Sequence, residues 1–500
     1  MMSAFIGIDL GTTFSAVATI DETGRAIIVH NKEGSNLTPS CVVETSPGVM
    51  EVGEFARRQW GSAPDTAAAR FKRDMGTSVT HRINSQDFTP TQLSTFVLKK
   101  LVSDAAKTLG PIGDAVVTIP ANFAHEARDA TMTAARDAGL NVRHIINEPT
   151  AAALYYAFKS GEELGGIYAV YDLGGGTFDV SIIRVNGQEV EVMATNGVSK
   201  LGGDDFDAAM RNLVRSKFKA LTGEDLEDDD FTTNEAEEEK KSLSSRKQVT
   251  IRVARQMIDI KREEFEEVIS SYITQAKMLC EATIDEADID VGDITGVFLA
   301  GGSTRIPLVM ESVKNVFKKD PTSSVNVDEV VALGAALYAA YKGDKDKLSV
   351  VQQNAIKKIR VAESTSMCFG TITLGQDEAR DTTRLFNSIL IRKGEKIPCS
   401  VTESFYTVHD GQEGVSCKVT ESSAAETDPR FVKVIWEGDL PLPAGRLANQ
   451  EIKVTFAFDE NQIMSISFLD VATKRETKVD LTMASAKSSD TRDIDKFLVE

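Results

Sequence analysis

Cysteine and histidine are scarce in this sequence, and neither residue type gathers into a cluster. Five cysteines and five histidines are scattered over 500 residues without metal-ligand spacing. Zinc centres and disulfide frameworks depend on such spacing, so neither is predicted. Scattered cysteines of this kind are typical of buried thiols in a reducing compartment.

Long apolar runs, a targeting segment and an excess of positive charge are also missing. No stretch reaches the ~18 apolar residues that a membrane-spanning helix needs, and residues 1–5 carry no basic region. The net charge of −19 disfavours nucleic acid or an anionic membrane surface as the main partner. We therefore expect a cytoplasmic protein that binds neither nucleic acid nor membrane.

The length of the chain predicts more than one domain. Five hundred residues exceed what one hydrophobic core usually supports, so two or three domains are expected. The composition, 42% hydrophobic and 26% charged, is that of an ordinary globular protein. No strand-to-helix segment has the spacing of a Walker loop or of a dinucleotide-binding turn, so neither of these nucleotide sites is predicted.

Two glycine-containing corners with the same residue order stand out. Residues 168–183 read as a strand, a glycine-rich turn from Asp172 to Asp179 and a second strand, and residues 6–17 repeat this order around Asp9. Successive glycines let backbone N–H groups converge on an anion, and aspartates are hard oxygen ligands for Mg²⁺. One such corner alone would predict only a turn. Its repetition predicts two related halves, each lending a phosphate-binding hairpin and a carboxylate to one cleft.

Periodicity predicts an alternating α/β region up to about residue 341. Strands are expected at 26–29, 115–120 and 295–300, and helices at 91–109, 124–139 and 330–341.

Two charged residues of this region are weighed as site candidates. A helix over residues 67–73 would carry Lys72, which on sequence alone is expected to be a solvated surface charge. Glu148 follows a strand and precedes Pro149, so it is either a helix cap or a site residue. The rule that ligands lie beyond the carboxyl ends of strands favours the site.

The chain changes character after about residue 342. A charged break is followed by alternating apolar and polar residues at 452–458, 463–468 and 477–481, which predict an antiparallel β-sandwich. The expected organisation is an α/β domain over residues 1–356, a linker over 357–366, a sandwich over 367–484 and a loose polar tail over 485–500.

Four motifs resemble those of the seventy-kilodalton heat-shock chaperones of the DnaK type. They are Ile6–Thr13, Ile146–Ala153, Asp172–Val180 and Gly301–Pro307. The resemblance extends over about residues 5–482 and is stronger before residue 341 than after it. The short interval from Phe71 to Ser94 is similar to the bacterial HscC-like branch. The resemblance implies a duplicated, two-lobed, actin-like ATPase domain followed by a β-sandwich that binds peptides.

The resemblance also implies the cofactors and the role of each matching residue. ATP or ADP would bind with Mg²⁺, and K⁺ is a further ion that such a site admits. Residues implied to carry hydrolysis are Lys72, which would orient or polarise the attacking water, Glu148, Asp172 and Thr177; those implied at the metal are Asp9, Asp172 and Asp179. Residues implied to hold the nucleotide are Asp9, Gly11, Thr12, Thr13, Gly174, Gly175, Gly176, Glu237, Lys240, Lys241, Ser244, Gly301, Gly302, Ser303 and Arg305. Pro120 and Arg128 match a switch that reports nucleotide state to the second domain.

In the sandwich, the resemblance implies a groove for an extended polypeptide. Its matching positions are Thr371, Phe405, Val415, Cys417 and Ile463, with Leu374 and Val408 as an arch. The alternative, that these residues are simply sandwich core, has equal weight. Unfolded polypeptide, a J-domain co-chaperone and a nucleotide-exchange factor are the implied partners.

Two departures from the family pattern leave a second function open. Residues 357–363 are charged where the family has an aliphatic linker, and the chain ends at Glu500 before the helical lid expected over the peptide. One function is a chaperone that hydrolyses ATP in client cycles, and the other is a lidless regulatory member that binds ATP without coupled client cycling. A third, a sugar kinase or a filament-forming actin relative, leaves the sandwich unexplained.

Overall fold

The computed structural model describes residues 4–160, 164–322, 325–377, 382–460, 462–481 and 494–500. The chain divides into two compact units, one of residues 1–361 with 493–500 and the other of residues 362–492. The division falls inside the predicted linker. Among the helices of the described residues, none is both long and apolar enough to cross a membrane.

The first unit contains a sheet that carries the N-terminal glycine corner. Its strands run in the order β11-β10-β1-β2-β3, with β4 also paired to β2. Their bounds are β1 Ala4–Asp9, β2 Phe14–Ile20, β3 Ala26–Val29, β4 Thr38–Pro39, β10 Ile112–Ile119 and β11 Asn141–Asn147. Strand β1 is antiparallel to β2 and parallel to β10. Asp9 is the last residue of β1, where the chain turns into β2.

A second sheet of the same unit carries the other glycine corner. Its order is β18-β17-β12-β13-β14-β19. The bounds are β12 Gly165–Leu173, β13 Phe178–Asn186, β14 Glu189–Val198, β17 Ile294–Ala300, β18 Pro321–Thr322 and β19 Arg360–Ala362. Here β12 is antiparallel to β13 and parallel to β17, which is the pairing that β1 makes with β2 and β10. Asp172 pairs with Asp179 across the hairpin, so both corners present an aspartate at the same kind of turn.

Two helices, α4 Glu148–Ser160 and α9 Val330–Lys342, share one hydrophobic core with both sheets. They approach closely because small residues lie at the contacts. A Cβ on Gly334 of α9 would overlap the backbone of Ala151 in α4, and a Cβ on Gly7 of β1 would overlap the backbone of Ala335 and Ala336. Glycine and alanine thus allow the two sheets to meet through these helices.

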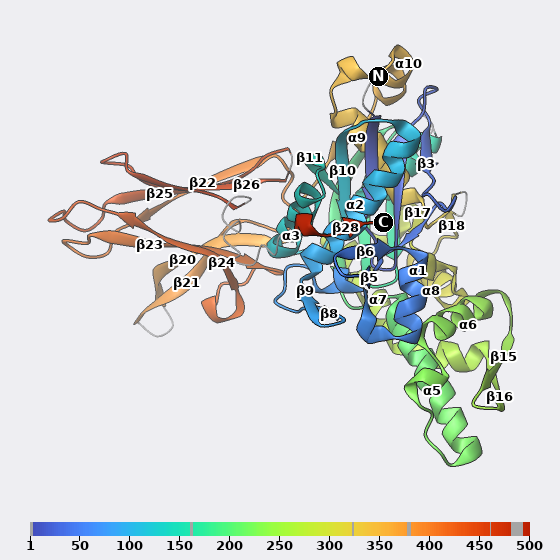
Figure 1. The fold of residues 1–500 in the computed structure, drawn as a ribbon. Coiled ribbons are helices and arrows are strands. Elements are labelled where there is room, and N and C mark those ends of the chain that lie inside the picture. Colours follow the sequence, from blue (N-terminus) through green and yellow to red (C-terminus); the bar gives the residue numbers. More distant parts are fainter. Residues whose placement is uncertain (1–3, 161–163, 323–324, 378–381, 461, 482–493) are drawn as a thin grey trace. The chain divides into compact units, whose positions relative to one another are not determined.

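The remaining elements of the first unit surround the two sheets (Figure 1). The helices are α1 Glu54–Ser62, α2 Pro90–Leu109, α3 His125–Asp137, α5 Gly203–Thr222, α6 Thr233–Ser245, α7 Arg262–Glu286, α8 Pro307–Phe317 and α10 Val350–Ile356. The strands are β5 Cys41–Ser46, β6 Val49–Val52, β7 Ala67–Ala69, β8 His81–Ile83, β9 Gln86–Phe88, β15 Gln248–Val253, β16 Gln256–Lys261 and β28 Leu498–Val499. The predicted helices at 91–109, 124–139 and 330–341 are confirmed as α2, α3 and α9, and the strands at 115–120 and 295–300 as β10 and β17.

The prediction of a helix over residues 67–73 is wrong. Ala67–Ala69 form β7, which pairs with β5, and a 3₁₀ helix spans Phe71–Asp74. Arg70 lies between them with a φ of 63°, a left-handed conformation that an α-helix cannot contain. Lys72 is only 3% exposed, so the expectation of a solvated surface charge is also wrong.

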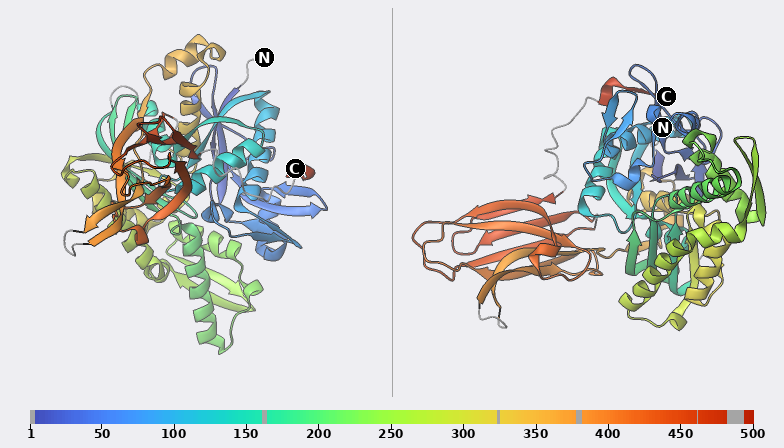
Figure 2. Two further views of the ribbon diagram at one scale, coloured as in Figure 1. Left: turned by 90° about the vertical axis from the view of Figure 1, so that its left-hand side faces the viewer. Right: turned by 90° about the horizontal axis from the view of Figure 1, so that it is seen from below.

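The second unit consists of two packed antiparallel sheets, as Figures 1 and 2 show. The strand orders are β21-β20-β23-β24 and β22-β25-β26-β27. The bounds are β20 Cys368–Asp377, β21 Thr382–Ile391, β22 Cys399–Tyr406, β23 Gly414–Ser422, β24 Lys433–Pro441, β25 Glu451–Phe458, β26 Met464–Asp470 and β27 Glu476–Asp480. The predicted sandwich strands at 452–458, 463–468 and 477–481 therefore match β25, β26 and β27 to within two residues at each end.

The predicted groove residues of the sandwich divide into two groups. Cys417 is fully buried and Thr371 is 3% exposed, so both belong to the interior. Phe405 and Val415 are partly buried against the core, as Ile463 is partly buried. The two predicted arch residues, Leu374 and Val408, are 44% and 47% exposed.

The expectation of a loose tail does not hold for residues 494–500. A 3₁₀ helix over Ile494–Lys496 leads into β28, and β28 pairs in parallel with β6 of the first unit. Buried apolar contacts supply the reason, because Ile494, Phe497 and Val499 pack on the same core as α2. The remainder of the predicted tail, residues 485–493, lies outside the described residues.

The close contact of α4 with α9 makes Gly334 a site where alanine should destabilise the protein. In an ordinary helix interior, glycine to alanine is favourable by about 1 kcal/mol. At Gly334 the overlap with the Ala151 backbone should make this replacement unfavourable. Gly334→Ala should therefore lower the free energy of unfolding, measured by urea titration, by roughly 1–3 kcal/mol. Gly292→Ala, where no atom lies within 4 Å of the added Cβ, is the control. Equal stability of the two variants would contradict the packing described for α9.

Candidate functional site

A cavity of about 470 Å³ lies in the first unit where the two glycine corners face each other. This volume is within the range of sites for nucleotide-sized ligands. Its lining comes from both sheets and from α5, α6 and the turn after β17. Of the predicted site residues, the cavity is lined by Asp9, Gly11, Thr12, Thr13, Lys72, Glu148, Asp172, Gly174, Gly175, Thr177, Glu237, Lys240, Lys241, Ser244, Gly301, Gly302, Ser303 and Arg305.

Two predicted site residues do not line this cavity. Gly176 packs against the first corner, since a Cβ there would lie 2.6 Å from the Thr12 Cγ2 atom. Asp179 is 1% exposed and lies one layer behind the wall, where the Asn122 N–H donates to its Oδ1 atom over 3.3 Å. Both residues therefore support the wall in this structure rather than form its surface.

The two glycine corners touch each other, and glycine is required for this contact. A Cβ on Gly175 would overlap the Thr13 hydroxyl of the opposite corner. The Thr13 Oγ1 atom is buried and is one of the side-chain oxygens without a hydrogen-bond partner among the described residues. A buried hydroxyl in this state calls for a polar ligand, because burial without a partner costs about 1–3 kcal/mol. A phosphate oxygen facing Thr13 would satisfy it.

The first corner is held by a short hydrogen-bond chain. The Gly11 N–H donates to the Ser15 hydroxyl over 3.1 Å, and the Ser40 hydroxyl donates to the Gly11 carbonyl over 2.8 Å. The second corner is closed by the Gly174 N–H, which donates to the Thr177 carbonyl over 3.1 Å. The Gly174 and Gly175 carbonyls accept from the first N–H groups of α5, those of Gly203 and Asp204. The backbone of both corners is thus fixed before any ligand binds.

Four carboxylates surround one lysine at the base of the cavity. The Lys72 Nζ atom lies 2.6 Å from the Glu148 Oε1 atom, and both side chains are buried. Loss of hydration, together with repulsion from Glu148, raises the pKa of Asp9 to about 7 and the pKa of Asp179 to about 8. The same causes raise the pKa of Asp172 well above its ordinary value.

This cluster of buried carboxylates is the feature that fits a divalent cation. If Asp9, Asp172, Asp179 and Glu148 were all ionised, Lys72 and the nearby Arg128 would not balance them, and the raised aspartate pKa values reflect this. Aspartate oxygens and water are the ligands Mg²⁺ takes beside phosphates. Among the described residues, no three such side chains are close enough to form a direct metal cage. The donor set therefore suits a Mg²⁺ ion that brings its own water and phosphate ligands.

The segment after β10 positions Lys72 and Asp179 from behind. The Phe123 ring centroid lies 5.8 Å from the Lys72 Nζ atom, and Asn122 contacts Asp179. Arg128, one of the two predicted switch residues, donates from Nε to the Phe123 carbonyl over 2.9 Å and from Nη2 to the Ala121 carbonyl over 3.2 Å. Arg128 therefore fixes the loop that follows Pro120, and this loop touches both charged residues.

The opposite end of the cavity is built from α6 and the turn after β17. The Glu237 carboxylate accepts from Arg57 of α1 at 2.8 Å and pairs with Lys241 at 2.8 Å. Lys240 pairs with Asp207 at 2.7 Å, and Arg305 pairs with Asp328 at 2.7 Å. These ion pairs place both positively and negatively charged side chains around this end of the cavity.

Burial by itself would raise the pKa of Glu237, which is 7% exposed. The charges of Lys241 and Arg57 outweigh this, with further contributions from a Lys241 hydrogen bond and from Lys240, and lower the pKa to about 2. Because Arg57 lies on α1 and Glu237 on α6, this pair links two helices that are far apart in the sequence.

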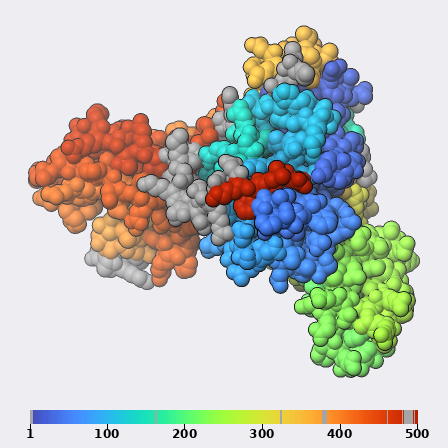
Figure 3. Space-filling model, in the orientation of Figure 1, coloured from blue at the N-terminus to red at the C-terminus, as the bar shows by residue number. Residues whose placement is uncertain are grey.

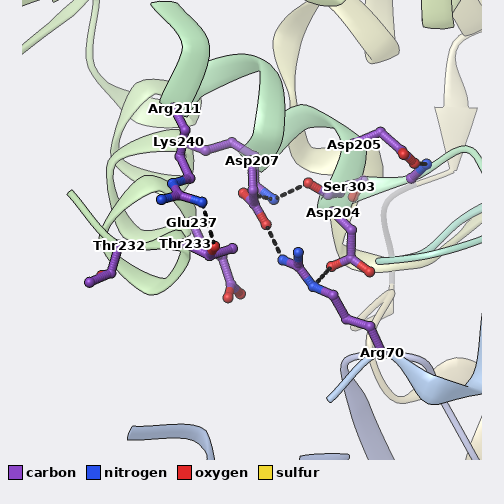
Figure 4. Close-up of polar contacts among 12 residues, drawn as sticks. Arg70, Asp204, Asp205, Asp207, Arg211, Thr232, Thr233, Glu237, Lys240 and Ser303 are labelled. Carbon is purple, nitrogen blue, oxygen red and sulfur yellow. Dashed lines mark hydrogen bonds and ion pairs between the residues drawn. The ribbon is translucent and has the colours of Figure 1, made fainter. Parts of the chain in front are cut away.

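A second set of ion pairs bridges the cleft beside the cavity (Figure 4). Arg70 pairs with Asp204 at 2.9 Å and with Asp207 at 3.2 Å, and Arg73 pairs with Asp205 at 2.8 Å. Loss of hydration is the main cause that raises the pKa of Asp204 to about 7. The positive charge of Arg70 lowers this pKa but does not outweigh the loss of hydration. Because Arg70 and Arg73 flank Lys72, these pairs hold the lysine segment against α5.

Sequence reasoning missed several residues of the cavity. They include Phe14, Leu37, Gly203, Asp204, Asp207 and Asp328. The run from Gly202 to Asp207, with two glycines before three acidic residues at a helix start, was the available signal for part of this group. No local pattern marks Asp328, which lines the cavity beside Gly302 and pairs with Arg305.

The Glu237 ion pairs predict a defined dependence of stability on pH. Since the pKa of Glu237 is about 2 in the folded protein and 4.5 in its ordinary state, its charge stabilises the fold above pH 4.5, and this contribution is lost as pH falls through about 2. Glu237→Gln should lower the free energy of unfolding at pH 7 by on the order of 3 kcal/mol. Urea titrations should show this difference shrinking as the pH is lowered below 4.5.

The neighbouring Glu238 supplies the matched control. Its side chain is 63% exposed and contacts the same Arg57 at 3.4 Å. Glu238→Gln should cost far less, because exposed ion pairs contribute little. Equal losses in the two variants would show that burial of Glu237 does not govern its contribution.

One comparison with known proteins bears on this geometry. A family model described as Hsp70 protein matches residues 5–500. The match spans both units and every residue that lines the cavity. ATP binding, ATPase activity and chaperone activity are the general properties that this family supports, in keeping with paired glycine corners and buried carboxylates around one cavity. The chain belongs to the Hsp70 family.

Proposed function

We propose that the protein is an ATP-dependent molecular chaperone that hydrolyses ATP to ADP and phosphate and binds extended apolar segments of unfolded polypeptides. The observation that carries this proposal is the meeting of two glycine corners around a lysine and carboxylates in one cavity. The proposal includes a duplicated, actin-like arrangement of the two sheets, a cytoplasmic location and slow turnover. It also includes the expected order of an ATPase domain, a linker and a sandwich, with the sandwich as the peptide-binding domain.

In this proposal the protein promotes hydrolysis by positioning the phosphates and the attacking water and by neutralising the charge of the phosphates. Bound Mg²⁺ would supply charge neutralisation for the phosphates and would be held near Asp9 and Asp172, with Asp179 behind them. Backbone N–H groups of the two corners and the hydroxyls of Thr13 and Thr177 would hold phosphate oxygens.

Lys72 is the residue proposed to orient the attacking water. Its Nζ atom is fixed by Glu148 at 2.6 Å and by the Phe123 face, so it points in one direction without a ligand present. Preorganised charge of this kind stabilises a transition state without reorganisation during the reaction. Glu148 is thus a positioning residue for Lys72, and the segment held by Arg70 and Arg73 fixes the other side of the lysine.

The sandwich offers exposed apolar side chains for a polypeptide. Leu374 on β20 and Leu385 on β21 are cross-strand partners, 44% and 55% exposed, and Val408 is 47% exposed. Apolar side chains of an extended segment could lie against such positions. The buried positions Thr371 and Cys417 support the strands beneath them. A J-domain co-chaperone and a nucleotide-exchange factor are the proposed protein partners.

The alternative is a lidless regulatory family member that binds ATP without coupled client cycling. The charged residues 357–363 favour it, because they are less suited than an aliphatic linker to dock in an apolar groove. The intact Lys72–Glu148 pair and the buried carboxylates favour hydrolysis. A sugar kinase or actin-like filament protein leaves the sandwich strands without a role.

Single-turnover hydrolysis tests the ATPase assignment. Lys72→Ala and Thr177→Ala should each slow the chemical step by about 10²–10³-fold, because each removes a preorganised donor near the transferred phosphate. Lys277→Ala, on an exposed position of α7, is the control and should hydrolyse ATP at the wild-type rate. Wild-type rates in both site variants would remove the assignment.

Peptide stimulation separates the chaperone from the regulatory alternative. An extended apolar peptide should bind the sandwich and accelerate steady-state ATP turnover, because coupled family members transmit peptide binding to the nucleotide site. Leu374→Asp should weaken peptide binding, measured by fluorescence anisotropy, while ATP turnover without peptide stays unchanged. A peptide that binds but leaves turnover unaltered would favour the regulatory member.

A further inference from the structure

The segment 494–500 forms an additional strand on a small sheet of the first unit. This sheet has the order β28-β6-β5-β7, with β28 at its edge. The Leu498 N–H donates to the Gly48 carbonyl and the Glu500 N–H to the Met50 carbonyl, each over 2.9 Å, and the Val52 N–H donates to the Glu500 carbonyl over 3.3 Å. The contact is therefore strand addition, in which backbone hydrogen bonds supply the attachment.

Side chains of the segment alternate between the protein and solvent, which gives the strand a defined docking face. Phe497 and Val499 face the core that contains α2, whereas Leu498 is 58% exposed. The Phe497 ring makes edge contacts with Phe88 at 5.7 Å and Phe96 at 5.5 Å between centroids. Phe88 and Phe96 are almost completely buried in this arrangement. Figure 3 shows the segment, in red, lying along this surface.

The receiving sheet leads directly to the nucleotide cavity. Strand β5 begins after Ser40, whose hydroxyl holds the Gly11 carbonyl. Strand β6 runs into α1, which carries Arg57 to Glu237, and β7 precedes the segment of Arg70 and Lys72. Each of the other three strands thus leads at one end into a segment that contacts or lines the cavity.

Because of the order of the two units along the chain, docking of residues 494–500 attaches the second unit at a second point. The second unit, residues 362–492, lies in the sequence between two parts of the first unit. It is therefore attached at both of its ends, once where β19 pairs with the second sheet and once where β28 pairs with β6. The two attachments are on different sheets of the first unit.

We propose that residues 494–500 are an intramolecular ligand of the β6 edge and form a second connection between the sandwich and the ATP site. Docking completes the small sheet and restrains the strands that carry Ser40, Arg57 and Lys72 to the cavity. The part of the proposal that concerns nucleotide rests on the ATPase function proposed above. The part that concerns docking does not.

A disulfide between engineered cysteines tests the docking in the full chain. Val49 and Leu498 are register partners, so Val49→Cys combined with Leu498→Cys should form a disulfide within one chain on mild oxidation. The single variants are controls for the native thiols, of which Cys41, Cys280, Cys368 and Cys417 are buried. A monomer with the new disulfide supports the proposal. A disulfide-linked dimer, or no disulfide, overturns it.

Hydrogen exchange tests the role of the aromatic contact. Phe497→Ala should speed exchange of the Leu498 and Glu500 amides by about tenfold or more, because the strand loses its anchor. Leu498→Ala, with its exposed side chain, is the matched control and should leave exchange near the wild-type rate. Equal rates in Phe497→Ala and the wild type overturn the docking. These two experiments use no ATP, so they stand independently of the ATPase assignment.

The release of labelled ADP tests the connection to the nucleotide site. Phe497→Ala should change the ADP dissociation rate several-fold relative to Leu498→Ala, since β6, which leads to Arg57 and pairs with β5, loses its edge neighbour. An unchanged rate in a variant whose amides do exchange faster overturns the connection. Failure of ADP to bind the wild-type chain would instead count against the ATPase function.

Discussion

The structure depends on the burial of several carboxylates beside a single lysine. Asp9, Asp172, Asp179 and Glu148 come from separate strand and helix ends and meet around Lys72. Loss of hydration raises the pKa values of the three aspartates, so their ionised forms are electrostatically unfavourable beside one another. Such a cluster persists only because the surrounding fold is rigid, and a bound cation with polyphosphate would relieve it.

Rigidity around this cluster comes from small residues and from ion pairs. Gly7 and Gly334 bring α9 close to β1 and α4, and Gly175 brings the two corners into contact. Across the cleft, Arg57 reaches Glu237 and Arg70 reaches Asp204. The first group fixes the floor of the cavity by close backbone packing. The second group holds α1 to α6 and the Arg70 segment to α5 by ion pairs between side chains.

The attachments of the sandwich differ from a single flexible linker. Residues 360–362 form β19 in the second sheet, where the Arg360 N–H donates to the Gln188 carbonyl over 3.2 Å. Charged residues can make this contact because strand pairing uses the backbone and not an apolar side-chain face. Together with β28, this connects both the second sheet and the small sheet β28-β6-β5-β7 to the sandwich along the chain. A charged linker is then compatible with communication between the units.

The sequence by itself determined the α/β and β-sandwich classes and the two aspartate corners, and its resemblance to a known family implied most of the cavity residues. The fold classes and the corners are local features, because hydrophobic period, glycine runs and repeated motifs are visible within short windows. Only the tertiary structure decided the burial of Lys72, the left-handed Arg70 between β7 and its 3₁₀ helix, the Asp204 and Asp207 pairs and the docking of β28. Each of these depends on a partner that is distant in the chain: Ala69 pairs with Cys41, Arg70 with Asp207 and Leu498 with Val49. Local propensity carries no information about such partners, so a helix was expected where a distant strand imposed an extended backbone.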